Sequence, residues 1–90
     1  MATQNTFHLV IASVGEKRFD GPAVSVTFPG TDGELTVLAH HEPFVTTLKA
    51  GTITIRLPGW QAGGGEDGPK NIPIEGGVLE VSGNRAVVLL

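Results

Sequence analysis

The side chains best suited to chemistry in this 90-residue chain are its three histidines and their acidic neighbours. His8, His40, His41 and Glu42 offer imidazole and carboxylate groups, which are natural ligands of zinc. His40 and His41 are adjacent, and adjacent side chains on an extended chain point in opposite directions, so the two cannot easily hold one ion. The sequence therefore favours solvent-exposed histidines, His8 on a strand and His40 in a loop, over a metal site.

A glycine-rich segment superficially resembles a phosphate-binding loop. Residues 63–71 read Gly-Gly-Gly-Glu-Asp-Gly-Pro-Lys-Asn. The phosphate-binding motif needs a lysine directly after its last glycine and a hydroxyl residue after that lysine, whereas here Pro69 precedes Lys70 and Asn71 follows it. Pro69 also removes a backbone N–H that a phosphate would need. We therefore expect no nucleotide cofactor, and we interpret residues 61–71 as a flexible hairpin loop.

Nucleophilic catalysis has no candidate residues with the required surroundings. None of Ser13, Ser25 and Ser82 stands in a Gly-x-Ser-x-Gly context, which would expose a serine on a strained turn. The chain contains no cysteine, so thiol nucleophiles, thiolate metal sites and disulfides are excluded. The sequence therefore predicts a non-catalytic protein without a cofactor or a metal.

Composition narrows the kinds of partner. The net charge is −3 and the six Lys and Arg residues are scattered, which argues against nucleic acid. No apolar run approaches the roughly 20 residues that span a bilayer, and the first six residues lack the profile of a secretory signal. The mean hydropathy of +0.14 is high for so small a domain, which suggests that some apolar surface meets another protein.

The elements that must position these residues are short strands. Apolar and polar residues alternate at period two, and no segment shows the 3.6-residue period of an amphipathic helix. The pattern predicts an all-β fold, a flattened β-sandwich or barrel of about 8–10 short strands in two sheets, with residues 1–90 forming a single domain. The expected strands lie near residues 7–11, 17–19, 24–28, 35–38, 44–48, 53–57, 72–74, 79–81 and 86–90.

Glycine, proline and asparagine mark the expected ends of these strands. Turns are predicted at Val14-Gly15-Glu16, at Pro29-Gly30-Thr31-Asp32-Gly33 and at Ser82-Gly83-Asn84-Arg85. Pro43 suits an edge or a loop, because it lacks a backbone donor. The pair Gly76-Gly77 is expected to separate two of the closing strands.

A resemblance to a known family is carried by residues 28–55, FPGTDGELTVLAHHEPFVTTLKAGTITI. They closely resemble the N-terminal domain of the epsilon subunit of F-type ATP synthases. The shared elements are a Gly-Glu-Leu turn, a hydrophobic strand, a His-x-Pro segment, a Thr-x-Leu pair and a glycine that opens the next strand. Here they are Gly33-Glu34-Leu35, Val37-Leu38, His41-Glu42-Pro43, Thr46-Thr47-Leu48 and Gly51. Residues 76–89 and 7–21 carry two further matches in the family's order.

This resemblance implies a ten-stranded β-sandwich on the rotor, bound to the gamma subunit and to the ring of c subunits. Such a subunit is peripheral, on the cytoplasmic face of the membrane, which it meets only through the complex. Glu34 is implied to face loops of the ring and to share the rotor-facing end of the sandwich with His41. Ser13, His41 and Thr46 are implied to lie towards gamma. The partner-binding residues implied are therefore Ser13, Asp32, Glu34, His41 and Thr46.

Three departures from the family accompany the resemblance. The chain ends before the helical hairpin that usually follows this domain, so the functions of that hairpin are not expected of it. Ala39-His40 stands where the family often has Pro-Gly, and the 61–71 loop is longer than usual. The residues themselves also allow a free-standing β-sandwich module that binds a peptide or a carbohydrate, and they allow Glu34 to be an ordinary solvated turn residue.

Overall fold

The computed structural model describes residues 5–58 and 70–90, and the strands in these ranges form one mixed sheet. Their order across the sheet is β2-β1-β7-β6-β5-β3-β4. The all-β prediction is confirmed. The predicted loop at 61–71 lies outside the described residues, except that Lys70 and Asn71 already belong to a strand. The strands are β1 (Phe7–Ser13), β2 (Glu16–Ala23), β3 (Ser25–Gly30), β4 (Gly33–Leu38), β5 (Phe44–Arg56), β6 (Lys70–Ser82) and β7 (Arg85–Leu89).

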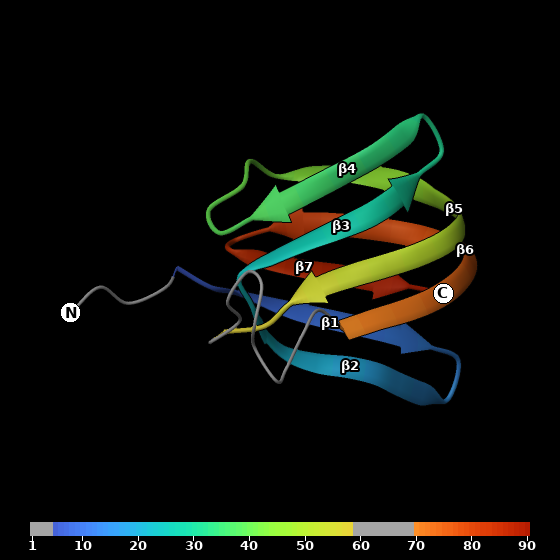
Figure 1. Ribbon diagram of the computed structural model, residues 1–90, viewed down its shortest axis with the longest axis horizontal. Helices are drawn as coiled ribbons and strands as arrows, with labels where there is room; N and C mark the ends of the chain where they lie inside the picture. Colours follow the sequence, from blue (N-terminus) through green and yellow to red (C-terminus); the bar gives the residue numbers. More distant parts are fainter. Residues whose placement is uncertain (1–4, 59–69) are drawn as a thin grey trace.

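Two long strands fold this single sheet into two layers. β5 and β6 have 13 residues each, and both curve through the end of the molecule that lies to the right in Figure 1. The β1 layer contains β2, β1, β7, the second half of β6 and the first half of β5. The β3 layer contains β4, β3, the second half of β5 and the first half of β6. The described residues form seven strands where about 8–10 short ones were predicted, because two expected breaks are bends inside continuous strands.

The bend has a signature in the burial of side chains. In β5 the buried positions change from even to odd numbers between Leu48 and Ile53, and in β6 they change between Ile74 and Leu79. Pairing of the two strands stays in register on both sides, with Leu48 opposite Gly77 and Ile53 opposite Ile72. Both strands thus switch the face that they turn to the core at the same corner.

Glycines allow the chains to approach closely at this corner. A Cβ on Gly77 would lie 2.6 Å from the carbonyl oxygen of Leu89, and one on Gly51 would lie 2.8 Å from Cβ of Pro29. Both distances are shorter than a side chain tolerates. Gly76 has φ 143°, a conformation that L residues rarely adopt. The Gly76-Gly77 pair that was expected to separate two strands instead permits one strand to turn the corner.

The core lies between the two layers and is made of the inward-facing residues of every strand except β2, which contributes only Ala23 at its end. Burying these aliphatic and aromatic side chains supplies most of the folding free energy of a chain without disulfides. Their alternation with exposed residues follows from the pleat of a strand. The buried apolar residues are Phe7, Leu9, Ile11, Ala23, Val26, Phe28, Val37, Leu48, Ile53, Ile55, Ile72, Ile74, Leu79, Val81, Ala86 and Val88.

The predicted turns are confirmed where the structure describes them. β1 and β2 are joined through Gly15 at φ 75°, and β3 and β4 through a turn that ends at Gly33. Gly83 and Asn84, at φ 55° and 56°, connect β6 to β7, as expected of a two-residue hairpin with both central residues left-handed. Pro43 lies in the connection between β4 and β5, as its missing donor predicted.

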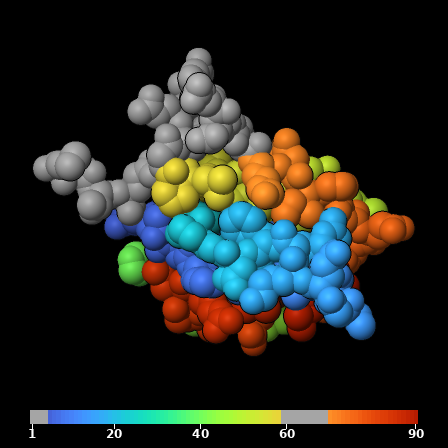
Figure 2. Space-filling view, turned by 90° about the horizontal axis from the view of Figure 1, so that it is seen from below, coloured from blue at the N-terminus to red at the C-terminus, as the bar shows by residue number. Residues whose placement is uncertain are grey.

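One side of the molecule is bounded by strands that do not pair with each other. Figure 2 shows β2 and the first half of β6 side by side there. The ammonium of Lys70 lies 5.7 Å from the centre of the Phe19 ring and so bridges the two strands. Near the corner an open groove of about 590 Å³ is lined by Arg18, Leu90 and residues 73–76.

Candidate functional site

The acidic turn implied to contact the ring lies at the corner end of the molecule. Asp32 is exposed in the connection between β3 and β4, and Glu34 is exposed as the second residue of β4. The turn is tied to β5 by a hydrogen bond from Thr31 N to Thr47 O (3.2 Å) and by one between the Thr31 and Thr47 hydroxyls (3.0 Å). The two carboxylates are therefore presented on a turn that is fastened to the long strand.

Ser13 shares this end with the acidic turn. It is the last residue of β1 and is half-buried. A continuous row of neighbours crosses the molecule here, because Gly30 pairs with Leu48, Leu48 with Gly77, and the backbone of Leu90 donates to Ala12 O at 2.8 Å. The turn that follows Ser13, between β1 and β2, and the turn between β3 and β4 therefore extend from the same end of the molecule.

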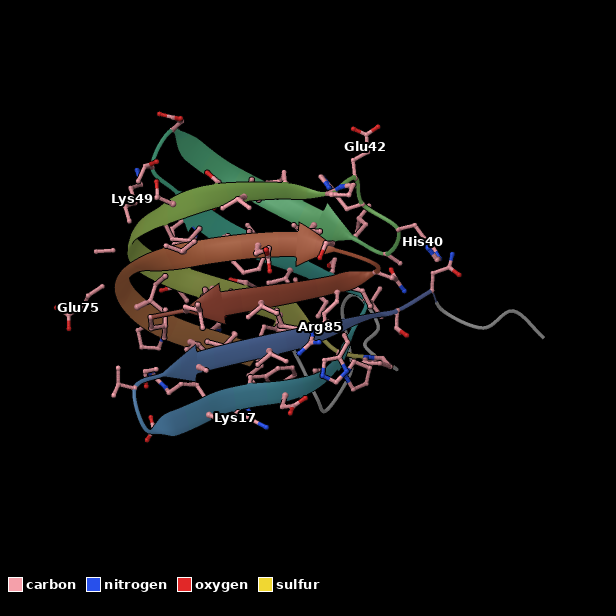
Figure 3. All side chains as sticks on the ribbon, turned by 180° about the vertical axis from the view of Figure 1, so that it is seen from behind. Lys17, His40, Glu42, Lys49, Glu75 and Arg85 are labelled. Carbon is pink, nitrogen blue, oxygen red and sulfur yellow. The ribbon has the colours of Figure 1, made fainter. Side chains whose placement is uncertain are left out.

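His41 lies at the opposite end, so the expectation that it shares an end with Glu34 is wrong. Glu34 is the second residue of β4, and the strand runs on from it to Leu38 over about 13 Å before the connection that contains His41 begins. In Figure 3, the two residues that flank His41 in sequence, which are His40 and Glu42, lie at the end of the molecule opposite to Lys49 and Glu75. The His41 ring is exposed, its Nδ1 lies 2.9 Å from Glu42 O, and its centre lies 4.9 Å from that of the Phe44 ring.

Thr46 lies between these two ends, near the middle of the first half of β5. It pairs with Leu79 and is half-buried, and it shares the inward-facing side of the strand with Phe44 and Leu48. The structure therefore does not gather Ser13, His41 and Thr46 into one cluster. They are distributed along the β1 layer and its connections, and their roles stay predictions.

The histidines considered as zinc ligands have other neighbours. His8 is exposed on β1, and its Nε2 contacts Oδ1 of Asp20. The other carboxylate oxygen of Asp20, Oδ2, accepts a hydrogen bond from Lys17 Nζ at 2.9 Å. The hydrogen bond from Lys17, and after it the one from His8, hold the pKa of the Asp20 carboxyl below its usual value. Among residues 5–58 and 70–90, no three His, Asp or Glu side chains could together hold a metal ion.

Asn84 joins three segments beside His41. Its Oδ1 accepts a hydrogen bond from His40 N at 2.7 Å, and its Nδ2 donates to Thr6 O at 2.9 Å. Its backbone oxygen accepts from His8 N at 3.2 Å. His40 and Asn84 both have positive φ, 62° and 56°. Such backbone conformations persist when surrounding contacts hold them, and here the Asn84 side chain supplies those contacts.

Replacing Asn84 with alanine is expected to lower the free energy of unfolding by about 2 kcal/mol, because two hydrogen bonds are lost and alanine disfavours the left-handed conformation. Asn84→Gly is expected to lose about half as much, since glycine adopts that conformation freely. Urea denaturation of the two variants beside the wild type measures both values. Equal stability of all three proteins would show that Asn84 does not hold this end together.

An exposed aliphatic surface covers the outer side of the β1 layer. Val45, Val78 and Leu89 are 65%, 41% and 60% exposed, and the register sets Val78 directly opposite Leu89. Half-buried aliphatic residues of β1 and β7 continue the surface, and one carboxylate, Glu80, lies within it. We call this surface the outer aliphatic face; it consists of Val10, Ala12, Val45, Val78, Val87 and Leu89 around Glu80.

Sequence analysis did not identify the outer aliphatic face, although a signal was present. The last strand ends in Val87-Val88-Leu89-Leu90 and β6 contains Val78-Leu79, so apolar residues occupy consecutive positions instead of alternating. Consecutive apolar residues indicate a strand covered on both faces. Val88 and Leu79 fill the core, which leaves the outward-facing residues for another surface.

The groove beside β2 is lined by Arg18 of β2, by residues 73–76 of β6 and by Leu90. Arg18 and Glu75 supply charges to its lining, and Ile74 and Leu90 supply apolar atoms. Arg18 Nε lies 3.7 Å from Glu16 Oε1, which is a weak ion pair outside the groove lining. A peptide or carbohydrate module would use such a groove, but no other observation favours that function.

The chain matches a family model described as ATP synthase, Delta/Epsilon chain, beta-sandwich domain, over residues 6–90. A protein of Delftia acidovorans named ATP synthase epsilon chain is 36% identical over 85 residues, which are 94% of this chain and 56% of that protein. One of Chlorobium limicola with the same name is 32% identical over 88 residues, 98% of this chain and 92% of that protein. The chain thus spans about half the length of the Delftia relative.

Solved structures show the same fold. A chain in the mitochondrial ATP synthase of Euglena gracilis, solved as OSCP/F1/c-ring in rotational state 1, superposes with a TM-score of 0.81 at 21% identity, covering 99% of this chain and 52% of that one. A chain in the central stalk and c-ring of the Tetrahymena thermophila mitochondrial ATP synthase gives 0.72 at 11% identity, covering 98% and 65%. At these identities the likeness establishes the fold alone.

Proposed function

The chain belongs to the ATP synthase delta/epsilon chain family, and on that basis we propose that it is a non-catalytic rotor subunit of an F-type ATP synthase. In this role it connects the gamma subunit to the c-ring and couples ion translocation to ATP synthesis or hydrolysis. The observation that carries the proposal is the match of the family's β-sandwich domain to residues 6–90, which include every described strand. Residues 1–90 act as one domain, and no cofactor is needed.

The proposed location is the cytoplasmic face of the membrane, as a peripheral part of the complex. The described residues contain no membrane-crossing helix. Contact with the membrane is proposed to be made only through the complex.

The corner end of the molecule is proposed to face the ring. Asp32, Glu34 and Glu75 place three acidic groups at this end, where Lys49 is also exposed. Exposed carboxylates on a fixed turn attract basic loops, and charges of this kind chiefly set orientation and the rate of encounter. Ser13, Thr46 and His41 are proposed to contact gamma at three separate points along the β1 layer.

Purified gamma and detergent-solubilised c-ring test the proposal directly. The wild-type chain is expected to bind gamma alone and to bind the assembly of gamma and ring more tightly. Glu34→Gln is expected to weaken only the second interaction, several-fold, and to reduce its dependence on salt, because a rim charge is lost. His41→Ala is expected to weaken the first.

Glu42→Gln is the matched control for Glu34, since Glu42 is an exposed acid at the opposite end of the molecule. Its affinity for the assembly should equal that of the wild type. Failure of the wild-type chain to associate with gamma would contradict the proposed function.

A further inference from the structure

Two Asp-Gly sequences within the described residues have different surroundings. Asp20-Gly21 lies inside β2, whereas Asp32-Gly33 lies where the turn between β3 and β4 meets β4. Both belong to the outermost strands of the sheet, β2 and β4. In an Asp-Gly sequence the glycine nitrogen can attack the aspartate side chain, because glycine has no side chain to obstruct the approach. A third such sequence, Asp67-Gly68, lies outside the described residues.

The reaction rearranges the main chain and needs only water. The glycine nitrogen bonds to Cγ of the protonated carboxyl, and the carboxyl OH leaves as water together with the N–H proton. The product is a five-membered cyclic imide. Water then adds to one imide carbonyl and breaks its C–N bond. Opening at the α carbonyl leaves an isoaspartate, whose main chain runs through Cβ and Cγ and is one carbon longer.

The side chain of Asp20 is held in the form that does not react. Its Oδ1 contacts Nε2 of His8, and its Oδ2 accepts a hydrogen bond from Lys17 Nζ at 2.9 Å. The hydrogen bond from Lys17, followed by that from His8, lowers the pKa of the Asp20 carboxyl. A lower pKa means less of the protonated carboxyl at neutral pH, so the attack by nitrogen is slower.

The backbone of Gly21 is also engaged. His8 N donates to Asn84 O, on the side of β1 that faces away from β2. Backbone groups of successive residues point to opposite sides of a strand, so Leu9 is the residue whose backbone faces Gly21, with which it pairs. The strand must therefore open locally before the Gly21 nitrogen can reach the Asp20 carboxyl.

Asp32 has neither restraint. It is exposed, and within the described residues its carboxyl makes no hydrogen bond or ion pair. Gly33 pairs with Gly30, and this is the pair of the β3–β4 ladder nearest the turn. Pairs at the end of a ladder open more readily than pairs inside it. The Gly33 nitrogen is therefore the more accessible of the two.

The turn has no room for an additional main-chain atom. Thr31 is fastened to Thr47 through its backbone nitrogen (3.2 Å) and through its hydroxyl (3.0 Å). A Cβ on Gly30 would lie 2.6 Å from Gly33 O, so β3 and β4 approach each other here too closely for a side chain. An added carbon must therefore move the residues that follow the turn, and Glu34 carries the first side chain among them.

We propose that Asp32-Gly33 is a site at which the protein converts spontaneously to isoaspartate, and that the conversion displaces Glu34 from its position beside the turn. Asp20-Gly21 stays largely unmodified in the folded chain. Because Glu34 is proposed to face the ring, ageing at Asp32 is expected to weaken that contact. This consequence rests on the proposed function, whereas the isomerisation does not.

Peptide mapping of the aged wild-type chain tests the site. Trypsin cuts after Arg18 and Lys49, so one peptide, residues 19–49, contains both aspartates, and electron-transfer fragmentation locates isoaspartate at either. After incubation at 37 °C and pH 7, isoaspartate is expected to have formed about 10-fold or more faster at Asp32 than at Asp20. Equal rates at the two sites would overturn the proposal.

Two controls separate the effect of the fold from that of the sequence. In concentrated urea both sequences are unfolded, so the two rates should become nearly equal. An excess at Asp32 that persists unchanged in urea would overturn the structural account. Lys17→Met removes the stronger hydrogen bond to Asp20 and is expected to raise the rate there several-fold without changing the rate at Asp32.

Binding to the assembly of gamma and c-ring tests the consequence. The aged wild type is expected to bind several-fold more weakly than the fresh wild type, because a rim carboxylate is displaced. Asp32→Glu should bind equally before and after ageing, since glutamate would have to close a six-membered imide and reacts slowly.

The outcomes distinguish the two proposals. If isoaspartate forms at Asp32 and the aged chain binds as the fresh chain does, the displacement of Glu34 is overturned. If the fresh chain does not bind the assembly, the proposed function fails, and the peptide map still decides the isomerisation.

Discussion

Replacing Phe28 with alanine is expected to lower the free energy of unfolding by about 3–5 kcal/mol, as for other large buried aromatic residues. Phe28 is the largest of the fully buried side chains and lies in β3, at the centre of its layer. A domain of this size has a total stability of about 5–13 kcal/mol. The variant should therefore unfold at much lower urea concentration, or fail to fold at 37 °C.

Phe19→Ala is the matched control, because it removes the same atoms from a half-buried position on the edge strand β2. It should cost less than half as much. Equal losses for the two variants would contradict the account of the core given above.

Gly77→Ala is expected to lower the free energy of unfolding by about 3 kcal/mol, the upper part of the range for overpacking. The added Cβ would lie 2.6 Å from Leu89 O and 3.1 Å from Cδ2 of Leu90. The nearer atom belongs to the backbone of β7 and cannot move without disturbing the pairing of β6 with β7. Urea denaturation and amide hydrogen exchange in β7 measure the effect.

Gly21→Ala provides the control, since a Cβ there would meet only the Phe19 ring at 3.8 Å, an ordinary contact. Its stability should stay within about 1 kcal/mol of the wild type. A Gly77 variant as stable as the Gly21 variant would show that the corner does not depend on a bare backbone at position 77.

The class of fold could be predicted from the sequence because burial repeats at every second residue. Phe7, Leu9 and Ile11 are all buried, as are Ile53 and Ile55. The number of strands could not be predicted, because the alternation changes from even to odd positions at the corner. Such a change is indistinguishable in sequence from the end of one strand and the start of another.

The arrangement of the candidate site was predictable only in part. The resemblance identified Glu34 and His41, and both are exposed as a partner contact requires. Their separation depends on the direction of β4, which places the start of the strand at the corner and its end beside Asn84. The outer aliphatic face was missed because a run such as Val87-Val88 does not show which side chain the fold leaves uncovered.

Crosslinking within the reconstituted complex of gamma, c-ring and this chain tests the central claim most directly. The chain has no cysteine, so single cysteines with a photoactivatable maleimide report one position each. Ser13→Cys, at a proposed gamma contact, should crosslink to gamma, and Asp32→Cys should crosslink to a c subunit, whereas Thr36→Cys on the β3 layer should not crosslink to gamma. Crosslinking of Thr36→Cys to gamma, with none from Ser13→Cys, would contradict the account.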